Sequence, residues 1–352
     1  MLVSPITQKA LYQKGKELYT EDGAESYPII HSVPVLLTGG EAADWHREII
    51  EVLLWQFPEK IEELYAKIDW SRPNISPIYI EYISALLKDK EGILSAVRSY
   101  SRDDTAKWII PKKNSTPVLR EDIKMFRERN TEKHAAARFA SVRGIGGKIY
   151  LPKYIEQVHA SRPSVIAELS TGAGTGTAAV ADKKARDCAM YSMDISFSCH
   201  GNTVSIAKYL DMKDTLLPVC ANFWNMPFAD ESVDVACSHF GLDESREINR
   251  TISEVARILK LGGRFINVSR SSAVSRSFDL FEPFGFTRDE MIEVMKTARL
   301  FSDTQGLIDQ CAGYGLGLSE KHVFKTDLER IQEVTVSVFV KKTLDKQRFN
   351  MT

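Results

Sequence analysis

The chain has 352 residues, of which 43% are apolar and 26% are charged, the composition of a globular protein with one large domain or two ordinary ones. Its formal net charge of −1 gives no support for a broadly basic surface that binds nucleic acid. There is no apolar run of about 18 residues to predict a membrane span, and the N-terminus lacks the pattern of a secretory signal.

Cysteine and histidine lack the spacing of a metal site or a disulfide framework. The five cysteines begin only at Cys188, and none of them forms a CxxC pair. The seven histidines show no HxH or HxxxH spacing. We therefore predict no metal site, and the cysteine pattern favours a reducing, cytoplasmic location.

Residues 1–145 are expected to form a mainly helical N-terminal domain, which is a candidate lid or substrate-binding part. Apolar residues recur at helical spacing in 42–57, 58–68 and 76–87. The moderately basic stretch 124–148 ends in a glycine-rich hinge. It is interpreted as a solvated helix that leads into the next domain, and a nucleic-acid contact is the alternative.

Residues 146–345 are expected to form a second domain, in which short apolar runs alternate with helical stretches. The predicted strands are 164–169, 188–194, 217–223, 233–240 and 263–269. An amphipathic helix is predicted at 244–260, with Gly262 placed to end it. Strands that alternate with helices predict a parallel sheet covered on both faces.

The end of this domain follows a different pattern. Residues 321–326 precede 333–342, where valines alternate with threonine, serine and phenylalanine. Such a period of two is typical of a strand in an antiparallel pair. The two segments are therefore predicted to close the sheet.

A glycine turn, ELSTGAGTGT, follows the first predicted strand of this domain. Gly172, Gly174 and Gly176 let the chain bend sharply and leave no side chain between the backbone and a ligand. Dinucleotide-binding proteins usually show GxGxxG, whereas here Thr177 occupies the place of the last glycine. The turn alone therefore does not choose between cofactors.

Two acidic residues narrow the choice. Glu168 ends the first predicted strand and Asp194 ends the second. A carboxylate in the position of Asp194 accepts hydrogen bonds from both ribose hydroxyls of an adenosyl group, and it repels a 2′-phosphate. NAD remains open on these residues alone.

Four segments in order resemble the class I S-adenosylmethionine-dependent methyltransferases, most of all the small-molecule group that includes quinone-biosynthesis methyltransferases. They are the glycine turn, MD at 193–194, CANFWNMPFADESVDVACSHF at 220–240 and EVARILKLGGRFINVS at 254–269. The resemblance implies an α/β fold with a Rossmann-like, seven-stranded methyltransferase sheet whose last strand is antiparallel. It also implies S-adenosyl-L-methionine as the cofactor.

The same resemblance implies which residues hold this cofactor. Those expected along its methionine part are Glu168, Ser170, Gly172 and Gly174. Those expected at its ribose and adenine are Asp194, Ile195, Asn222 and Phe223. The family usually has aspartate at the position of Asn222, whose carbonyl can still accept a bond from the adenine amine.

His239 ends the fourth predicted strand, below the expected methyl group, and is the candidate catalytic residue. An O or N acceptor loses a proton on methylation, so a base is useful there. The alternatives for His239 are a backbone contact or the orientation of the cofactor. The acceptor is expected at 269–301, whose phenylalanines favour an apolar or aromatic molecule, or at the N-terminal domain.

A fainter likeness concerns YPIIHSVPVLL at 27–37. It looks like the end of a small zinc-ribbon leader that precedes some methyltransferases, but the metal-binding cysteines of such leaders are absent. A plain edge hairpin is an equally good interpretation.

The sequence thus predicts a cytoplasmic methyltransferase for a small molecule, such as a secondary metabolite or a modified peptide. The alternative hypotheses are an RNA or protein methyltransferase, a non-catalytic cofactor-binding subunit, and an NAD-dependent oxidoreductase. No membrane or nucleic-acid partner is expected, and a homodimer is left open.

Overall fold

The computed structural model describes residues 2–37, 120–144, 149–242, 248–270, 304–328 and 331–343. Nearly all of them belong to one compact unit, which joins residues 1–36, 125–272 and 302–352. The three helices predicted between residues 42 and 87 lie outside the described residues, and so do the phenylalanines of the predicted acceptor segment. The predicted division of the chain near residue 145 stays a prediction.

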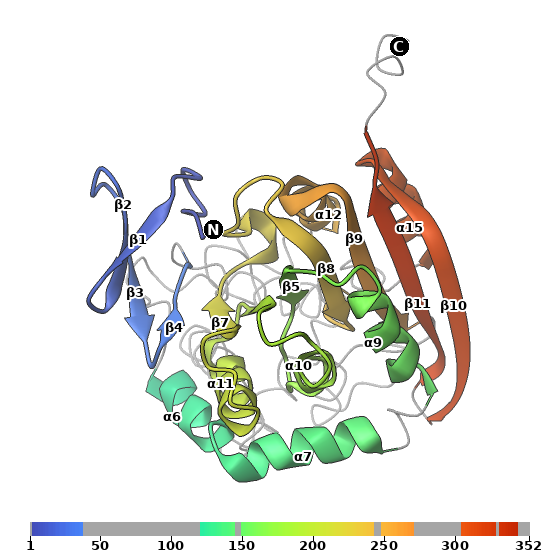
Figure 1. Ribbon diagram of the computed structural model, residues 1–352, viewed down its shortest axis with the longest axis horizontal. Coiled ribbons are helices and arrows are strands. Elements are labelled where there is room, and N and C mark those ends of the chain that lie inside the picture. Colours follow the sequence, from blue (N-terminus) through green and yellow to red (C-terminus); the bar gives the residue numbers. More distant parts are fainter. Residues whose placement is uncertain are drawn as a thin grey trace, which may run out of the picture. The chain divides into compact units, whose positions relative to one another are not determined.

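The unit is built on one seven-stranded sheet (Figure 1). Its strands, in chain order, are β5 (Val165–Leu169), β6 (Ala189–Asp194), β7 (Leu216–Cys220), β8 (Val233–His239), β9 (Leu259–Arg270), β10 (Leu316–Leu328) and β11 (Ile331–Lys341). Their spatial order is β10-β11-β9-β8-β5-β6-β7. The strands from β5 to β9 pair in parallel, and β11 runs antiparallel to both β9 and β10. The predicted α/β sheet and its antiparallel last strand are confirmed.

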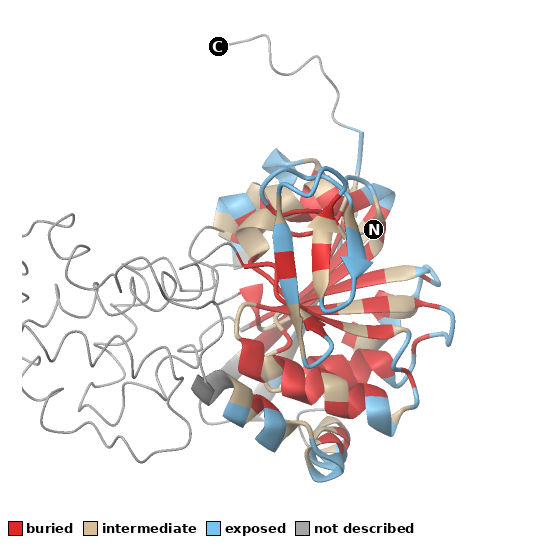
Figure 2. Ribbon diagram, turned by 90° about the vertical axis from the view of Figure 1, so that its left-hand side faces the viewer, coloured by how far each residue is buried: buried red, intermediate tan, exposed pale blue. Residues whose placement is uncertain are grey.

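Helices cover both faces of this sheet. Buried residues of α7 (Glu132–Arg143), α9 (Leu151–His159), α10 (Thr175–Ala181) and α11 (His200–Tyr209) share one apolar cluster with the strands. Residues of α12 (Ile248–Ile258) and α15 (Thr304–Gly313) share the other. Figure 2 shows the buried residues gathered in the sheet and on the helix sides that face it. The sheet therefore lies between two layers of helices.

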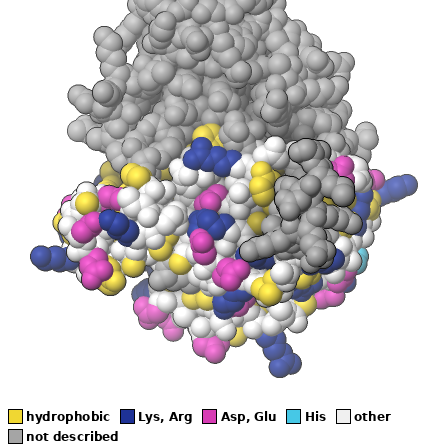
Figure 3. Space-filling model, turned by 90° about the horizontal axis from the view of Figure 1, so that it is seen from above, with side chains coloured by type: hydrophobic (Ala, Val, Ile, Leu, Met, Phe, Trp, Pro, Cys, Tyr) yellow, Lys and Arg dark blue, Asp and Glu magenta, His cyan; other side chains and the backbone are white. Residues whose placement is uncertain are grey.

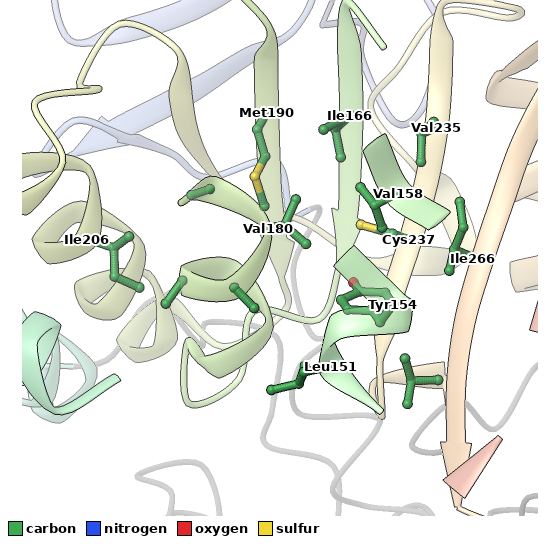
Figure 4. Packing of buried hydrophobic residues seen from close by; sticks show 14 of the residues in the cluster. Leu151, Tyr154, Val158, Ile166, Val180, Met190, Ile206, Val235, Cys237 and Ile266 are labelled. Carbon is green, nitrogen blue, oxygen red and sulfur yellow. The ribbon is translucent and has the colours of Figure 1, made fainter. Parts of the chain in front are cut away.

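The first cluster is anchored by α9 (Figure 4). Tyr154 and Val158 lie one helical turn apart, so both side chains face the strands. Tyr154 points toward Cys237 of β8, and neither residue is exposed. These contacts hold α9 against the centre of the sheet.

The amphipathic helix predicted at 244–260 is confirmed where the structure describes it, from Ile248 to Ile258. Ile252 and Val255 face the core as expected. The helix ends two residues before the predicted end at Lys260, because β9 already begins at Leu259. Gly262 lies beyond the helix, in the left-handed region with φ +76°.

Residues 2–37 are not helical, and the expected helical character of the N-terminal domain is wrong there. They form β1 (Leu11–Lys14), β2 (Glu17–Thr20), β3 (Ser26–Ile30) and β4 (Val33–Pro34), an antiparallel sheet in sequential order. Positive φ angles at His31 and Ser32 make the two-residue turn of the hairpin at 27–37. The segment is therefore a hairpin, and its likeness to a leader stays a prediction.

This small sheet is tied to the edge of the large one. Val35 pairs in parallel with Cys220 at the end of β7, and Leu36 N–H donates to the Cys220 carbonyl at 2.8 Å. Val3 N–H donates to the Pro227 carbonyl at 3.0 Å. Backbone bonds therefore cover part of the edge at β7, which an open strand would leave unpaired.

Where the structure describes it, up to residue 144, the basic stretch 124–148 forms parts of two helices rather than one solvated helix; most of its predicted glycine-rich hinge lies outside the described residues. They are α6 (Arg120–Arg129) and α7, and the side chain of Thr131 caps α7 by accepting from His134 N–H at 3.2 Å. Phe126 is buried and stacks on Phe197 with ring centroids 5.1 Å apart. One side of the stretch is therefore packed, which accounts for its apolar residues.

The described surface carries no strong bias of charge in the view from above. Figure 3 shows Lys and Arg side chains interspersed with Asp and Glu over the described part of that face. Within the described residues, no cluster of His, Cys, Asp and Glu could hold a metal ion. No helix in the same residues has the length and apolar character needed to cross a membrane.

Candidate functional site

The glycine turn joins the end of β5 to the start of α10. Ser170, Gly172 and Gly174 have φ angles of +70°, +48° and +84°. A Cβ atom added to Gly174 would lie 2.8 Å from Cβ of Asn202 in α11, so the turn and that helix are in close contact. Asn202 also fixes the turn, because its Nδ2 donates to the Gly172 carbonyl at 3.0 Å. At position 174, only glycine fits this bend without strain.

Asp194 at the end of β6 is bonded directly to this turn. Its Oδ2 accepts from Gly172 N–H and its Oδ1 accepts from Ser196 N–H, both at 2.8 Å. The side chain is nearly buried. Each carboxylate oxygen can accept a second hydrogen bond. The arrangement therefore places an acceptor for two hydroxyl groups beside the bend.

Glu168 lies behind the turn and is completely buried. Its Oε2 accepts from Thr177 Oγ1 at 2.8 Å and from Ser192 Oγ at 2.5 Å, while Oε1 has no hydrogen-bond partner. Burial raises the pKa of this carboxyl to about 7, although the two hydroxyl groups oppose the rise. Its predicted contact with the cofactor stays a prediction. The structure places the carboxyl beneath α10 rather than on an open surface.

The raised pKa of Glu168 predicts how the free energy of unfolding depends on pH. The folded protein keeps this proton up to about pH 7, whereas the unfolded chain releases it near 4.5. Folding therefore binds a proton in this window, and the free energy of unfolding falls by about 3 kcal/mol as pH rises through it. Glu168→Gln keeps the hydrogen-bond acceptor and removes the titration. Relative to wild type, the variant should gain about that amount between pH 4.5 and pH 8.

Urea unfolding of the two proteins at several pH values measures this difference. Glu156→Gln, at an exposed position on α9, is the matched control and should leave the pH profile of the wild type unchanged. A Glu168→Gln profile parallel to that of the wild type would mean that Glu168 is ionised in the folded protein throughout the range.

Asn222 and Ile195 follow the ends of the neighbouring strands β7 and β6. Asn222 Oδ1 accepts from Trp224 N–H at 3.0 Å, whereas its Nδ2 is buried and has no partner. The side chain therefore has an N–H group that lacks a hydrogen bond, whereas its carbonyl oxygen already accepts one. Ala221 N–H donates to the Asp194 carbonyl at 3.0 Å, and this bond joins the segment after β7 to the end of β6. Ile195 and Phe223 are both half-buried nearby in the chain.

His239 ends β8 and packs on the first turn of α10. A Cβ atom on Gly176 would lie 2.8 Å from Cβ of His239, so these two elements touch at that glycine. The His239 Nε2 lies 3.1 Å from Tyr150 Oη, and the two rings stack with centroids 5.7 Å apart. Phe240 also packs against the imidazole, at 4.5 Å between centroids. The imidazole is thus held in one orientation beside a hydroxyl that can exchange a proton with it.

The predicted residues come together at the carboxyl ends of the parallel strands. Gly172, Asp194, Asn222 and His239 follow or end the parallel strands β5, β6, β7 and β8. Carboxyl ends of parallel strands are where α/β proteins bind ligands. Sequence reasoning missed Tyr150 because it lies 89 residues from His239 and no motif joins them. It also missed Asn202, which lies within a helix without a recognisable pattern.

Part of the chain is similar in sequence to a known protein family and to several known proteins. The family described as "Methyltransferase domain" matches residues 168–267. The demethylmenaquinone methyltransferase of Symbiobacterium thermophilum is 30% identical over 137 residues, which are 38% of this chain and 52% of that protein. The malonyl-[acyl-carrier protein] O-methyltransferase 1 of Coxiella burnetii is 28% identical over 131 residues, 37% of this chain and 43% of that protein. The chain spans about half the length of these curated relatives.

A solved structure resembles the chain more loosely. The N-methyltransferase NodS of Bradyrhizobium japonicum, in complex with S-adenosyl-L-homocysteine, is 12% identical and aligns with a TM-score of 0.41. The alignment covers 54% of this chain and 85% of that one. At this level the likeness bears on neither substrate nor mechanism.

Proposed function

Because the chain carries a class I S-adenosylmethionine-dependent methyltransferase domain, we propose that the protein moves a methyl group from S-adenosyl-L-methionine to an O, N or C atom of a small acceptor. The acceptor has an apolar or aromatic body, as in a secondary metabolite or a modified peptide. One of the two relatives named above is an O-methyltransferase, and the name of the other gives no atom, so the atom methylated is left open.

One observation carries the cofactor assignment. The carboxylate of Asp194 and the glycine turn are joined by the bond from Gly172 N–H, so a ribose held by the acid lies beside the bend that would receive the methionine part. A carboxylate accepts well from a vicinal diol, because bonds to a charged acceptor are stronger than neutral ones. The unpartnered Nδ2 of Asn222 supports an adenine next to the ribose, because adenine N1 and N3 accept hydrogen bonds.

Methyl transfer from a sulfonium is an in-line displacement, in which the acceptor atom attacks the methyl carbon and the thioether leaves. The protein mainly has to place the two reactants. For an O or N acceptor, His239 would take the proton that is lost, and Tyr150 would hold its imidazole. A carbon acceptor reacts as an enol or phenol that loses its hydroxyl proton, and His239 would take that proton in the same way.

The proposal includes a cytoplasmic location. None of the five cysteines forms a disulfide, and Cys188, Cys220, Cys237 and Cys311 are buried. Cysteines outside disulfides are typical of proteins from reducing compartments.

A calorimetric titration tests the proposal against an NAD-dependent oxidoreductase, the alternative that shares a ribose-binding acid. We expect S-adenosyl-L-homocysteine to bind with one site per chain and NAD to give no binding heat. Binding of NAD in the absence of S-adenosyl-L-homocysteine binding would refute the proposal. Transfer of a labelled methyl group to any member of a metabolite and peptide panel would then separate an enzyme from a non-catalytic subunit.

A further inference from the structure

Five buried polar atoms without a hydrogen-bond partner lie on two paired strands, β9 and β11. They are Nδ2 and Oδ1 of Asn267, Oγ of Ser269, Oγ1 of Thr335 and Oγ of Ser337. The four residues are at most 1% exposed. We call these four side chains the polar ladder.

The register of the strands puts the polar ladder on one face of the sheet. Ser337 lies opposite Asn267, and Thr335 lies opposite Ser269. Side chains alternate between faces along a strand, so the ladder shares its face with Phe265 and is opposite to Val268. It continues the stacked ring pair of Phe265 and Phe339, whose centroids are 5.8 Å apart, toward the carboxyl end of β9.

The composition of the ladder is unusual for a packed sheet. A buried hydroxyl or amide that lacks a hydrogen bond destabilises the folded state, and native proteins pair the great majority of such groups. Elsewhere in the same sheet, buried hydroxyls do have partners: Ser192 donates to Glu168, and Ser238 accepts from Leu242 N–H. The polar ladder therefore calls for a partner that the described residues do not supply.

The ladder is also in reach of the candidate cofactor site. Asn267 lies opposite Ser238 of β8, and Ser238 lies opposite Leu169, the last residue of β5 before the glycine turn. Two strand spacings, about 10 Å, therefore separate Asn267 from the strand that leads into the turn. Strand β8 lies between them, and a molecule of about that length could reach from the ladder to the end of β5.

We propose that the polar ladder binds an uncharged hydrogen-bonding group of the methyl acceptor, such as a carboxamide, a phenol or a ketone. This inference rests on the proposed function. Three hydroxyl groups and one amide offer both donors and acceptors and carry no charge, so they suit a neutral polar group better than an ion. The acceptor then combines an apolar body with one polar group that fixes its orientation in the site.

The stability of the protein without ligand gives the first test. Thr335→Val together with Ser337→Ala removes two unpartnered hydroxyls and keeps the shape of the strand. The melting temperature should stay unchanged or rise, because no hydrogen bond is lost. Ser205→Ala is the matched control, since its equally buried Oγ donates to the Asn202 carbonyl at 2.8 Å. That control should melt about 2–4 °C lower.

Small probes give the second test. In protein labelled with ¹⁵N at asparagine, benzamide and phenol should shift the side-chain amide resonance of Asn267, and toluene should not. The double variant should raise the dissociation constant of benzamide at least about tenfold, as expected for the loss of about one hydrogen bond. The titration is run with and without S-adenosyl-L-homocysteine, and the affinity of the double variant for that nucleoside should match the wild type.

Three results would overturn the inference: no probe shifts the Asn267 resonance, the double variant binds benzamide as tightly as the wild type, or the double variant melts as low as Ser205→Ala. In the last case the hydroxyls are structural. If benzamide binds as expected but S-adenosyl-L-homocysteine does not bind to the wild type, the polar ladder is a binding site and the proposed function fails. The two ideas are thus tested separately.

Discussion

Asp194→Ala is expected to weaken the binding of S-adenosyl-L-homocysteine by about 10²–10⁴-fold, the loss of two hydrogen bonds to a charged group. The substitution removes the acceptors for both ribose hydroxyls. It also removes the bonds from Gly172 N–H and Ser196 N–H, which hold the glycine turn in place. Calorimetric titration of the two proteins measures the effect.

Two further variants make this result specific. Asp194→Asn keeps the shape and one acceptor oxygen, so its loss of affinity should fall between the wild type and the alanine variant. Asp187→Ala, at an exposed site two residues before β6, changes net charge by the same amount and should bind like the wild type. Equal affinities for the wild type and Asp194→Ala would show that Asp194 does not hold the ribose.

Gly174→Ala is expected to lower the free energy of unfolding by about 2–5 kcal/mol. The left-handed φ of +84° disfavours alanine by about 1–2 kcal/mol. The new methyl group would also meet Asn202 Cβ at 2.8 Å, and overpacking of this kind costs about 1–3 kcal/mol more. Because Asn202 fixes the Gly172 carbonyl, the variant should lose cofactor affinity as well.

Gly262→Ala separates the cost of the left-handed φ from the cost of the steric contact. Its φ of +76° is nearly the same, but a Cβ atom there would meet nothing within 4 Å. Only the conformational part, about 1–2 kcal/mol, should be lost in urea unfolding. If both alanine variants lost the same stability, the contact between the glycine turn and α11 would not be tight, and the described geometry of the turn would be incorrect.

The large sheet could be predicted from the sequence because its strands are buried on both faces. Runs such as VDVACSH in β8 are apolar enough to stand out between helical segments, and each ends near a turn residue. The antiparallel β11 could be predicted from its period of two. The ends of the elements were less certain, as the early end of α12 at Ile258 shows.

The small N-terminal sheet could not be predicted with the same reasoning. Its strands have only two to five residues, too few to establish a period against the strong helical pattern that follows from residue 42. Its connection to the large sheet is made by contacts distant in sequence, such as Val35 with Cys220. Local patterns carry no information about such pairing.

Of the candidate site, too, one part could be predicted from the sequence and another part could not. Asp194 and the glycine turn were predicted to be neighbours because adjacent parallel strands bring their carboxyl ends together, and the bond to Gly172 N–H agrees with this. Tyr150 and the polar ladder were missed. In β11, Thr335 and Ser337 suggest a solvent-exposed face by their polarity, yet both are buried. A period of two tells which residues share a face but not what covers that face.

The structure of the protein bound to S-adenosyl-L-homocysteine tests the central claim most directly. The account predicts that both ribose hydroxyls lie within hydrogen-bond distance of the Asp194 carboxylate, with the amino-acid part of the ligand over the bend from Ser170 to Gly174. A ligand bound at another edge of the sheet, or with its ribose away from Asp194, would contradict it.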